Sequence, residues 1–519
     1  MRRKALILTV SVAALGLALF LYRIRPANTF HIEDILTVYQ EHADYNDLSI
    51  DYPLDETLFP PEMIAPTFRW SDSLSASKAW LVQVSLAGGE TRLHFLSHRQ
   101  QWKPQPQDWR KMKKMTVDRD AEVVILGVSS AERPAIVSKA RMTFRTSKDP
   151  VGAPLFYREV ELPFVKAEKN LPGVRWRFGA IDNPSPPVVL KDLPVCGNCH
   201  SFTSDGRTLA MDVDYASRKG SYVITKVKRQ MVLARQDVIT WTDEENTEQS
   251  HGLLSQVSPD GRYVVSTVRD MSVFIPQPSL AFSQQFFPVK GILCVFDRET
   301  RRFRNLPGAD DLRYVQTNPT WSPAGKHMVF ARARAPDLSN TKHQGFVWLT
   351  PSESREFVDK DEPFSFDLYR IPFNEGEGGT AEPLEGASNN GMSNYFPRYS
   401  PDGRWIVFCR AKSFMLLQPD SELHIIPAEG DKARRLGCNT SRMNSWHSFS
   451  PNGRWLVFAS KAYSDYTQLC LTHIDDSGCS TPPVLLEHFT EPDRAANIPE
   501  FVNADPDSIA AIHERFLDR

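Results

Sequence analysis

The chain has few cysteines, no block of like charge and no familiar catalytic motif. Seven cysteines in 519 residues are too few for a disulfide-built domain. A net charge of −2, with no run of five or more like charges, argues against a nucleic-acid binder. Nucleophile elbows, phosphate loops, zinc-protease helices and dinucleotide fingerprints are all missing from the sequence. The length excludes a single core and predicts two or three domains.

One long apolar run lies at the N-terminus. Arg2, Arg3 and Lys4 precede the 18 residues 5–22, just enough for a helix to cross a hydrocarbon core of roughly 30 Å. The run ends beside Arg23 without a small-residue cleavage site, so residues 1–25 are predicted to be an uncleaved signal anchor. The chain is then a single-pass protein of the inner membrane with its bulk in the periplasm. Cleavage and release into the periplasm is the alternative.

Five segments in the second half repeat one pattern of strand, tight turn and strand. In each, a Ser-Pro-Asp-Gly-like turn precedes an unbroken run of β-branched and aromatic residues, as in buried strands. The turn glycines are Gly206, Gly261, Gly325, Gly403 and Gly453. Units of roughly 40–50 residues, with insertions, are typical of propeller blades.

These turns resemble the repeats of TolB-like β-propellers. The resemblance implies an all-β propeller of about six blades, of which five are visible. The sixth would come from Arg175-Trp-Arg-Phe178 or from the segment after Cys470. The resemblance implies a fold and leaves function open, since propellers serve as enzymes, electron carriers and docking scaffolds.

The remaining sequence predicts further parts around a propeller at 201–500. Residues 26–60 are expected to be a tether with a short helix near 32–39. Four strand-like runs at 67–70, 79–85, 121–127 and 139–145 predict an immunoglobulin- or fibronectin-III-like sandwich over 61–165. A connector covers 166–200, and 335–361 is expected to be a surface loop. Asp505 and Pro506 predict the start of a C-terminal helix within 501–519.

The motif with the most chemical content is Cys196-Gly-Asn-Cys-His200. This spacing is the attachment signature of a c-type haem: Cys196 and Cys199 would form the thioethers and His200 would be the proximal iron ligand. We therefore predict one covalent haem c. A local Cys196–Cys199 disulfide and a zinc site made by both cysteines with His200 and His447 are the alternatives.

The distal ligand is less well specified by the sequence. A hairpin turning at 204–207 places Met211 opposite His200, with Cβ atoms about 4.5–5.5 Å apart, too close to flank a porphyrin. Met211 is therefore expected in the core. His447 stands at the same distance from its turn glycine as His200, which makes it the first candidate for a haem held over the axial opening. Weaker candidates are His251, Met392 and Met443.

Five cysteines lie outside the motif, an odd number that leaves at least one unpaired within the chain. They are Cys294, Cys409, Cys438, Cys470 and Cys479. Cys409 lies within an apolar strand-like run and is expected to be a buried thiol.

Three functions remain open at this point. The first is a membrane-anchored mono-haem protein that transfers electrons or senses redox state or a small ligand, with a redox partner in the envelope. The second is an envelope scaffold that binds protein or glycan without haem. The third is a haem-linked oxidoreductase, for which the sequence supplies no substrate chemistry.

Overall fold

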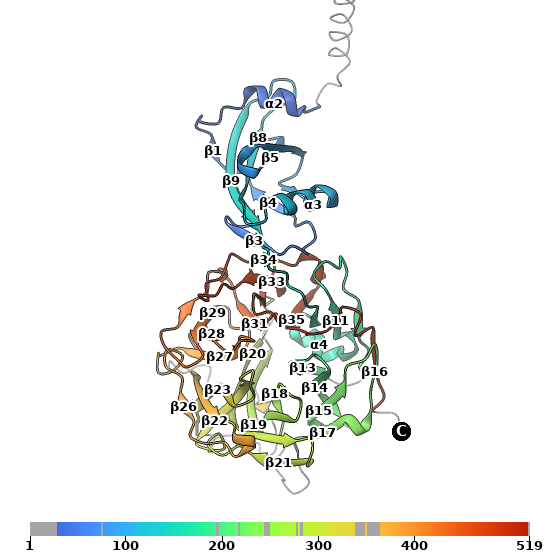
Figure 1. Ribbon diagram of the computed structural model, residues 1–519, viewed down its shortest axis with the longest axis vertical. Coiled ribbons are helices and arrows are strands. Elements are labelled where there is room, and N and C mark those ends of the chain that lie inside the picture. The colour runs from blue at the N-terminus through green and yellow to red at the C-terminus, as the bar shows by residue number, and fades with distance from the viewer. Residues whose placement is uncertain are drawn as a thin grey trace, which may run out of the picture. The chain divides into compact units, whose positions relative to one another are not determined.

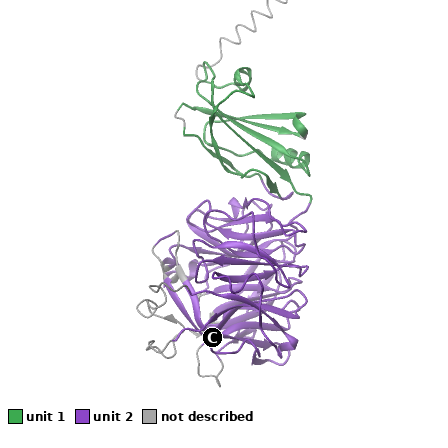
Figure 2. Ribbon diagram, turned by 90° about the vertical axis from the view of Figure 1, so that its left-hand side faces the viewer, with its two compact units in different colours: residues 1–59, 65–148 green, residues 60–64, 149–519 purple. Residues whose placement is uncertain are grey.

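The computed structural model describes residues 29–73, 76–193, 197–215, 218–242, 250–276, 279–280, 284–337, 348–349 and 364–516. The chain divides into two compact units: unit 1 comprises 1–59 and 65–148, and unit 2 comprises 60–64 and 149–519 (Figure 2). The apolar run 5–22 lies outside the described residues, so the signal anchor stays a prediction. Within the described ranges, no helix is long and apolar enough to cross a membrane.

Unit 1 is built from two β-sheets and two short helices. The larger sheet has the order β1 (Asn46–Asp47), β9 (Ile136–Thr146), β8 (Ala121–Val128), β5 (Ala79–Leu86) and β6 (Thr91–Ser97), with β3 (Thr57–Phe59) also on β9. The smaller sheet has the order β2 (Ser49–Tyr52), β4 (Phe68–Ser71) and β7 (Gln101–Trp102). The helices are α2 (Ile32–Val38) and α3 (Pro106–Met115).

The predicted strands of unit 1 are present as β4, β5, β8 and β9, and the predicted short helix is α2. The prediction of a tether over 26–60 was wrong. Strands β1 and β3 pair in parallel with β9, and β2 pairs with β4, so this segment belongs to the sheets. These strands are short, and the strands they pair with lie far away in the sequence, so the residues of 46–59 alone did not indicate a sheet. The specific immunoglobulin-like assignment stays a prediction.

The described part of unit 2 forms the six blades of a propeller (Figure 1). Four blades are separate four-stranded sheets, and blades 2 and 3 belong to one nine-stranded sheet in which β20 and β22 pair at Gly291 and Val315. Blade 1 contains β13 (Gly197–Phe202), β14 (Thr208–Tyr215), β15 (Arg218–Lys226) and β17 (Val238–Thr240). Blade 2 contains β18 (Leu253–Val257), β19 (Tyr263–Pro276), β20 (Gln284–Asp297) and β21 (Arg302–Asn305). Blade 3 contains β22 (Tyr314–Trp321), β23 (His327–Arg334), β25 (Asp367–Pro372) and β26 (Glu382–Pro383).

Blades 4 and 5 repeat the same order, and blade 6 closes the ring. Blade 4 contains β27 (Ser393–Tyr399), β28 (Trp405–Ala411), β29 (Glu422–Pro427) and β30 (Arg434–Arg435). Blade 5 contains β31 (Asn444–Phe449), β32 (Trp455–Ser460), β33 (Gln468–His473) and β34 (Val484–Leu485). Blade 6 contains β35 (Arg494–Phe501), β10 (Leu155–Glu161), β11 (Arg175–Gly179) and β12 (Val188–Leu190).

The sequence repeats are confirmed as the turns between the first and second strands of blades 1 to 5. All five turn glycines have φ between 67° and 78°, the left-handed region that glycine adopts without strain. Blade 6 combines both segments suggested for it, because β35 from the C-terminal part pairs with β10. The propeller therefore begins at β10, inside the region assigned to the sandwich and the connector, and those boundaries were wrong.

The C-terminal helix predicted within 501–519 was also wrong. Residues Ala511–Glu514 form β36, which pairs in parallel with β16 (Gln230–Leu233). Ile509 and Ile512 are buried in the core cluster that contains Met231 and Leu233 of β16. Pairing with β16 and burial of Ile509 and Ile512 overrode the local helix signal.

Candidate functional site on the propeller axis

The first strand of every blade carries a bulge at the same place, and the bulges surround the propeller axis. The pairing shifts register there in all six blades, where an extra residue is inserted in the inner strand. The equivalent residues are Cys199, Leu254, Asn318, Phe396, Trp446 and Ile498. The last five have φ between 47° and 57°, an uncommon region for residues other than glycine.

All six bulge residues line one small cavity. Its volume is about 30 Å³, and His200, Gln256, Arg398, His447 and Pro499 complete the lining. A space of this size holds about one water molecule. Phe396 and Trp446 fill much of the axis, with their rings stacked 4.5 Å apart. The axis is therefore a packed centre with a water-sized void.

His200 is fully buried beside this void. It pairs opposite Met211, as expected, and Met211 is a core residue. The ring packs edge-on against Phe156 at 4.7 Å, and neither ring nitrogen has a hydrogen bond of standard geometry within the described residues. Burial lowers the pKa of His200 to about 3, so the imidazole is neutral at physiological pH.

His447 occupies the equivalent position in blade 5, which confirms the shared register predicted from the turns. Its Nε2 lies 2.9 Å from the carbonyl oxygen of Val407 in blade 4, and its Nδ1 lies 3.9 Å from Cys409 Sγ. Burial lowers its pKa to about 3 as well. The ring thus joins two blades through the hydrogen bond to Val407. Its role as a distal ligand stays a prediction.

His251 does not line the axial cavity. It lies before β18, where its backbone N–H donates to Asp270 Oδ1 at 2.7 Å. Asp270 is buried at a bulge of β19, and burial raises its pKa to about 7. The structure therefore places His251 next to a buried carboxyl group of its own blade.

Three polar side chains interact across the axis, and the sequence analysis did not predict this contact. Arg398 of blade 4 donates to Gln256 Oε1 of blade 2 at 3.0 Å and lies 3.5 Å from Glu500 Oε2 of blade 6. The three residues occupy the same position in alternate blades, directly after the residues equivalent to His200. Aligning the five turns would have placed Gln256 and Arg398 together, but Glu500 lies in a blade without the turn motif.

The β19–β20 hairpin covers the end of the axis at which β13 begins (Figure 1). It rises from blade 2, and its side chains reach other parts of the ring. Phe287 stacks on Phe414 of the blade 4 loop at 4.7 Å, and Phe274 packs against Phe164 of α4 (Phe164–Lys169), next to blade 6, at 5.3 Å. Lys461, which follows β32 of the opposite blade, donates to Leu280 O at 2.7 Å. The hairpin therefore spans the ring.

The fit of a haem to these residues has two sides. A neutral, buried imidazole suits an iron ligand, so His200 matches the donor chemistry. A void of about 30 Å³ between His200 and His447 does not accommodate a porphyrin, and the hairpin covers the opening above it. Cys196 lies outside the described residues. The axial cavity is therefore too small to hold a haem.

The prediction of a buried thiol at Cys409 is confirmed. Cys409, Cys438 and Cys470 are free and buried, whereas Cys479 is free and exposed. Burial raises the pKa of the Cys409 thiol to about 12, so it is a protonated core group at physiological pH. Within the described residues, no cluster of three or more histidine, cysteine or acidic side chains has the arrangement of a metal site.

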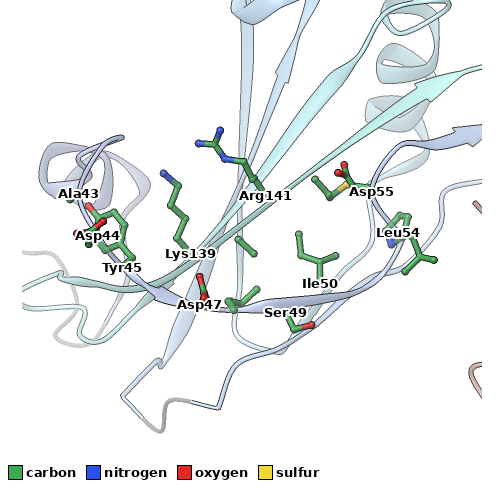
Figure 3. A pocket seen from close by; sticks show the side chains of 14 residues that line it. Ala43, Asp44, Tyr45, Asp47, Ser49, Ile50, Leu54, Asp55, Lys139 and Arg141 are labelled. Atoms are coloured by element: carbon green, nitrogen blue, oxygen red, sulfur yellow. The ribbon is translucent and has the colours of Figure 1, made fainter. Parts of the chain in front are cut away.

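Unit 1 has a hollow of about 580 Å³ between the β1–β2 segment and β9 (Figure 3). Lys139 and Arg141 project from β9 on one side of it, and Asp47 and Asp55 lie along the facing segment. Lys139 Nζ donates to Glu41 O at 2.8 Å, and Asp55 Oδ1 accepts from the Thr143 backbone N–H at 2.7 Å. These two charged groups hold the segment against the sheet.

The known proteins most useful for comparison are propellers. No family model matches the chain, and no curated protein matches it. A putative TolB from Agrobacterium tumefaciens is 14% identical, with 67% of this chain and 98% of that chain covered and a TM-score of 0.36. The Kuenenia stuttgartiensis hydrazine synthase is 13% identical, with coverages of 58% and 71% and a TM-score of 0.34. The Pseudomonas aeruginosa periplasmic gluconolactonase is 14% identical, with coverages of 64% and 82% and a TM-score of 0.34. At these TM-scores and identities, the similarities say nothing about the ligand or activity of this chain.

Proposed function

We propose that the chain is an exported propeller scaffold that binds a partner, protein or glycan, on the outer surface of the propeller, without a haem. The observation that carries the proposal is the filled axis. Many propellers use the central opening for ligands, whereas here Phe396, Trp446 and Arg398 fill it and the β19–β20 hairpin spans one end. Binding is then left to the faces and the rims between blades. The N-terminal apolar run supports export and attachment to the inner membrane.

The scaffold proposal is tested on the full chain in its own membranes. A photo-activated cross-linker at exposed turn positions of the propeller should trap a partner. The variant carrying Cys196→Ala and Cys199→Ala should trap the same partner with the same yield, because the scaffold needs no haem. The native protein should give no haem peroxidase signal in a denaturing gel. Loss of the partner in the double variant would contradict the proposal.

A second candidate function rests on one specific observation, the fully buried and neutral imidazole of His200 next to Cys199. In this candidate Cys196 and Cys199 hold a haem c covalently and His200 is its proximal ligand; the haem would supply one-electron chemistry. Since the axial void is too small, the porphyrin would have to lie outside that void. A haem stain that survives denaturation and disappears in the double cysteine variant would establish this candidate and overturn the haem-free scaffold.

A further inference from the structure

The turns between first and second strands form a ring on one face of the propeller, and this ring has one gap. At the junction of blades 3 and 4, a side-chain carbon placed on Gly403 would lie 3.8 Å from Pro323 of the preceding turn. At the junction of blades 4 and 5, a carbon on Gly453 would lie 3.6 Å from Pro401. In both cases the proline ring of one turn covers the glycine of the next.

At three further junctions, a hydrogen bond joins the turn of one blade to the next blade. Between blades 1 and 2, the Ser204 N–H donates to Pro259 O at 3.0 Å. Between blades 6 and 1, Asn503 Nδ2 donates to Ser204 O at 3.0 Å. Between blades 5 and 6, Asn452 Nδ2 donates to Pro150 O at 2.6 Å. Five of the six junctions in the described propeller are therefore closed by the chain itself.

The junction of blades 2 and 3 is open. A side-chain carbon placed on Gly325 would have no neighbour within 4 Å among the described residues, although Pro259 of the preceding turn is the equivalent of Pro323 and Pro401. The space between the two turns is a groove of about 630 Å³, here called the blade 2–3 groove. Pro259, Pro323 and Pro372 line it, and Tyr263, Trp321 and Phe373 form its floor.

The charge of the groove also departs from that of the turns in blades 1 and 4. In blades 1 and 4 the turn carboxylate pairs with the arginine that follows the glycine: Asp205 with Arg207 at 3.8 Å and Asp402 with Arg404 at 2.5 Å. Blade 3 has Ala324 in place of that carboxylate. Lys326 then stands exposed in the groove with no ion pair within the described part of the chain. The groove thus lacks a ring against Gly325 and an ion-pair partner for Lys326 among the described residues, although the carboxylates of Asp260 and Glu375 also line it.

Sugar stacking does not suit this groove. The three floor rings are largely buried against one another, with Tyr263 and Trp321 each packed edge-on to Phe373 at 4.9 and 4.6 Å. No broad aromatic face is left for a pyranose. A proline ring fits the space between Pro259 and Gly325, and a neighbouring carboxylate supplies the ion-pair partner for Lys326.

We propose that the blade 2–3 groove binds an extended peptide of a partner protein in which a proline stands next to an acidic residue. The proline ring packs between Pro259 and Gly325, as Pro323 and Pro401 do at the next two junctions. The carboxylate pairs with Lys326. This inference rests on the proposed scaffold function and names the partner's chemistry and its site.

The test uses a fluorescein-labelled (Pro-Glu)5 peptide and fluorescence anisotropy with the full chain in detergent. We expect saturable binding that weakens with salt. Ala324→Asp introduces the carboxylate that blades 1, 2 and 4 have at this position, and it should weaken binding about two- to fivefold, the value of one exposed ion pair. Lys326→Trp fills the groove and should abolish binding. Arg207→Trp, at the same turn position of blade 1, is the matched control and should bind as the wild type does. Circular dichroism melts show that the variants fold.

Several outcomes would overturn the inference. These are no binding by the wild type, equal binding of (Pro-Lys)5, or Lys326→Trp binding as tightly as Arg207→Trp. Stronger binding of an acidic oligosaccharide that displaces the peptide would assign the groove to a glycan instead. Failure of the scaffold function itself would give a different result, because no partner would then be cross-linked from any turn of the propeller. A partner trapped in the cell but insensitive to Lys326→Trp would overturn the groove and leave the scaffold standing.

Discussion

His200 and His447 face equivalent positions in the second strands of the blades that precede their own. His447 Nε2 lies 2.9 Å from the carbonyl oxygen of Val407, in the second strand of blade 4. His200 packs on Phe156, which occupies the equivalent position in the second strand of blade 6. Both rings therefore lie between their own blade and the preceding one. A histidine at this position is a blade-to-blade contact in its own right, with or without a bound group.

The two histidines make the propeller sensitive to acid. Each has a pKa lowered by burial from the ordinary value of 6.5 to about 3. The unfolded chain binds more protons than the folded chain between these values, so stability is complete above pH 6.5 and falls as the pH drops toward 3. The expected slope is about 1.4 kcal/mol per pH unit for each histidine.

This slope is measured by urea unfolding at pH 7, 6, 5 and 4. His447→Gln keeps an amide donor for Val407 but does not titrate, so its stability should depend less steeply on pH, by about 1.4 kcal/mol per unit below pH 6.5. Other titrating groups are common to both proteins and cancel in the difference. Parallel curves for the variant and the wild type would show that His447 does not carry the effect.

One buried carboxylate joins β10 to β11 within blade 6. Glu159 of β10 is 1% exposed, and its Oε2 accepts from Arg175 at 2.6 Å and Arg177 at 2.7 Å. Glu159→Gln leaves these cations without that charge and is expected to cost about 3–5 kcal/mol of unfolding free energy. The matched change Glu377→Gln removes an exposed partner of Arg304 and should cost less than about 1 kcal/mol. Equal costs in urea unfolding would contradict the role of Glu159.

The sequence was most informative where local chemistry decides the structure. The turn at Gly403 needs a proline, an aspartate and a glycine in fixed order, so five turns could be found without a structure. Blade 6 has no such turn, because β35 and β10 come from distant parts of the chain, and only their pairing shows that they form one sheet. The strand Ala511–Glu514 escaped prediction for the same reason: its partner β16 lies almost 300 residues earlier.

The candidate site was only partly predictable from the sequence. The equivalence of His200 and His447 follows from counting back from Gly206 and Gly453. The size of the axial cavity could not be predicted from the sequence. The bulges that turn Phe396 and Trp446 onto the axis depend on backbone angles that no local motif specifies. The bond between Arg398 and Gln256 likewise requires knowing that blades 2 and 4 meet across the axis.

The N-terminal run supplies a prediction outside the described residues. Residues 1–22 are expected to keep the chain in the membrane after a carbonate wash, since 18 apolar residues just span the hydrocarbon core. Replacing Leu6 and Leu8 with arginine should release the protein. Recovery of a mature N-terminus near residue 23 by sequencing would show a cleaved leader instead.

The β19–β20 hairpin is expected to open on its own when its main anchor is removed. Phe287 is fully buried, stacked 4.7 Å from Phe414 and 5.2 Å from Phe364. Phe287→Ala should remove about 3–5 kcal/mol of packing, and since these contacts lie outside the four-stranded blades, the loss should appear as local opening. Amide hydrogen exchange in 271–275 and 286–290 should become faster while β28 and β32 keep their protection. The control Phe303→Ala removes a ring of the same blade that is 37% exposed and should leave the hairpin unchanged. Uniformly faster exchange throughout unit 2 would show instead that the hairpin is part of the cooperative core and does not open separately from the axis.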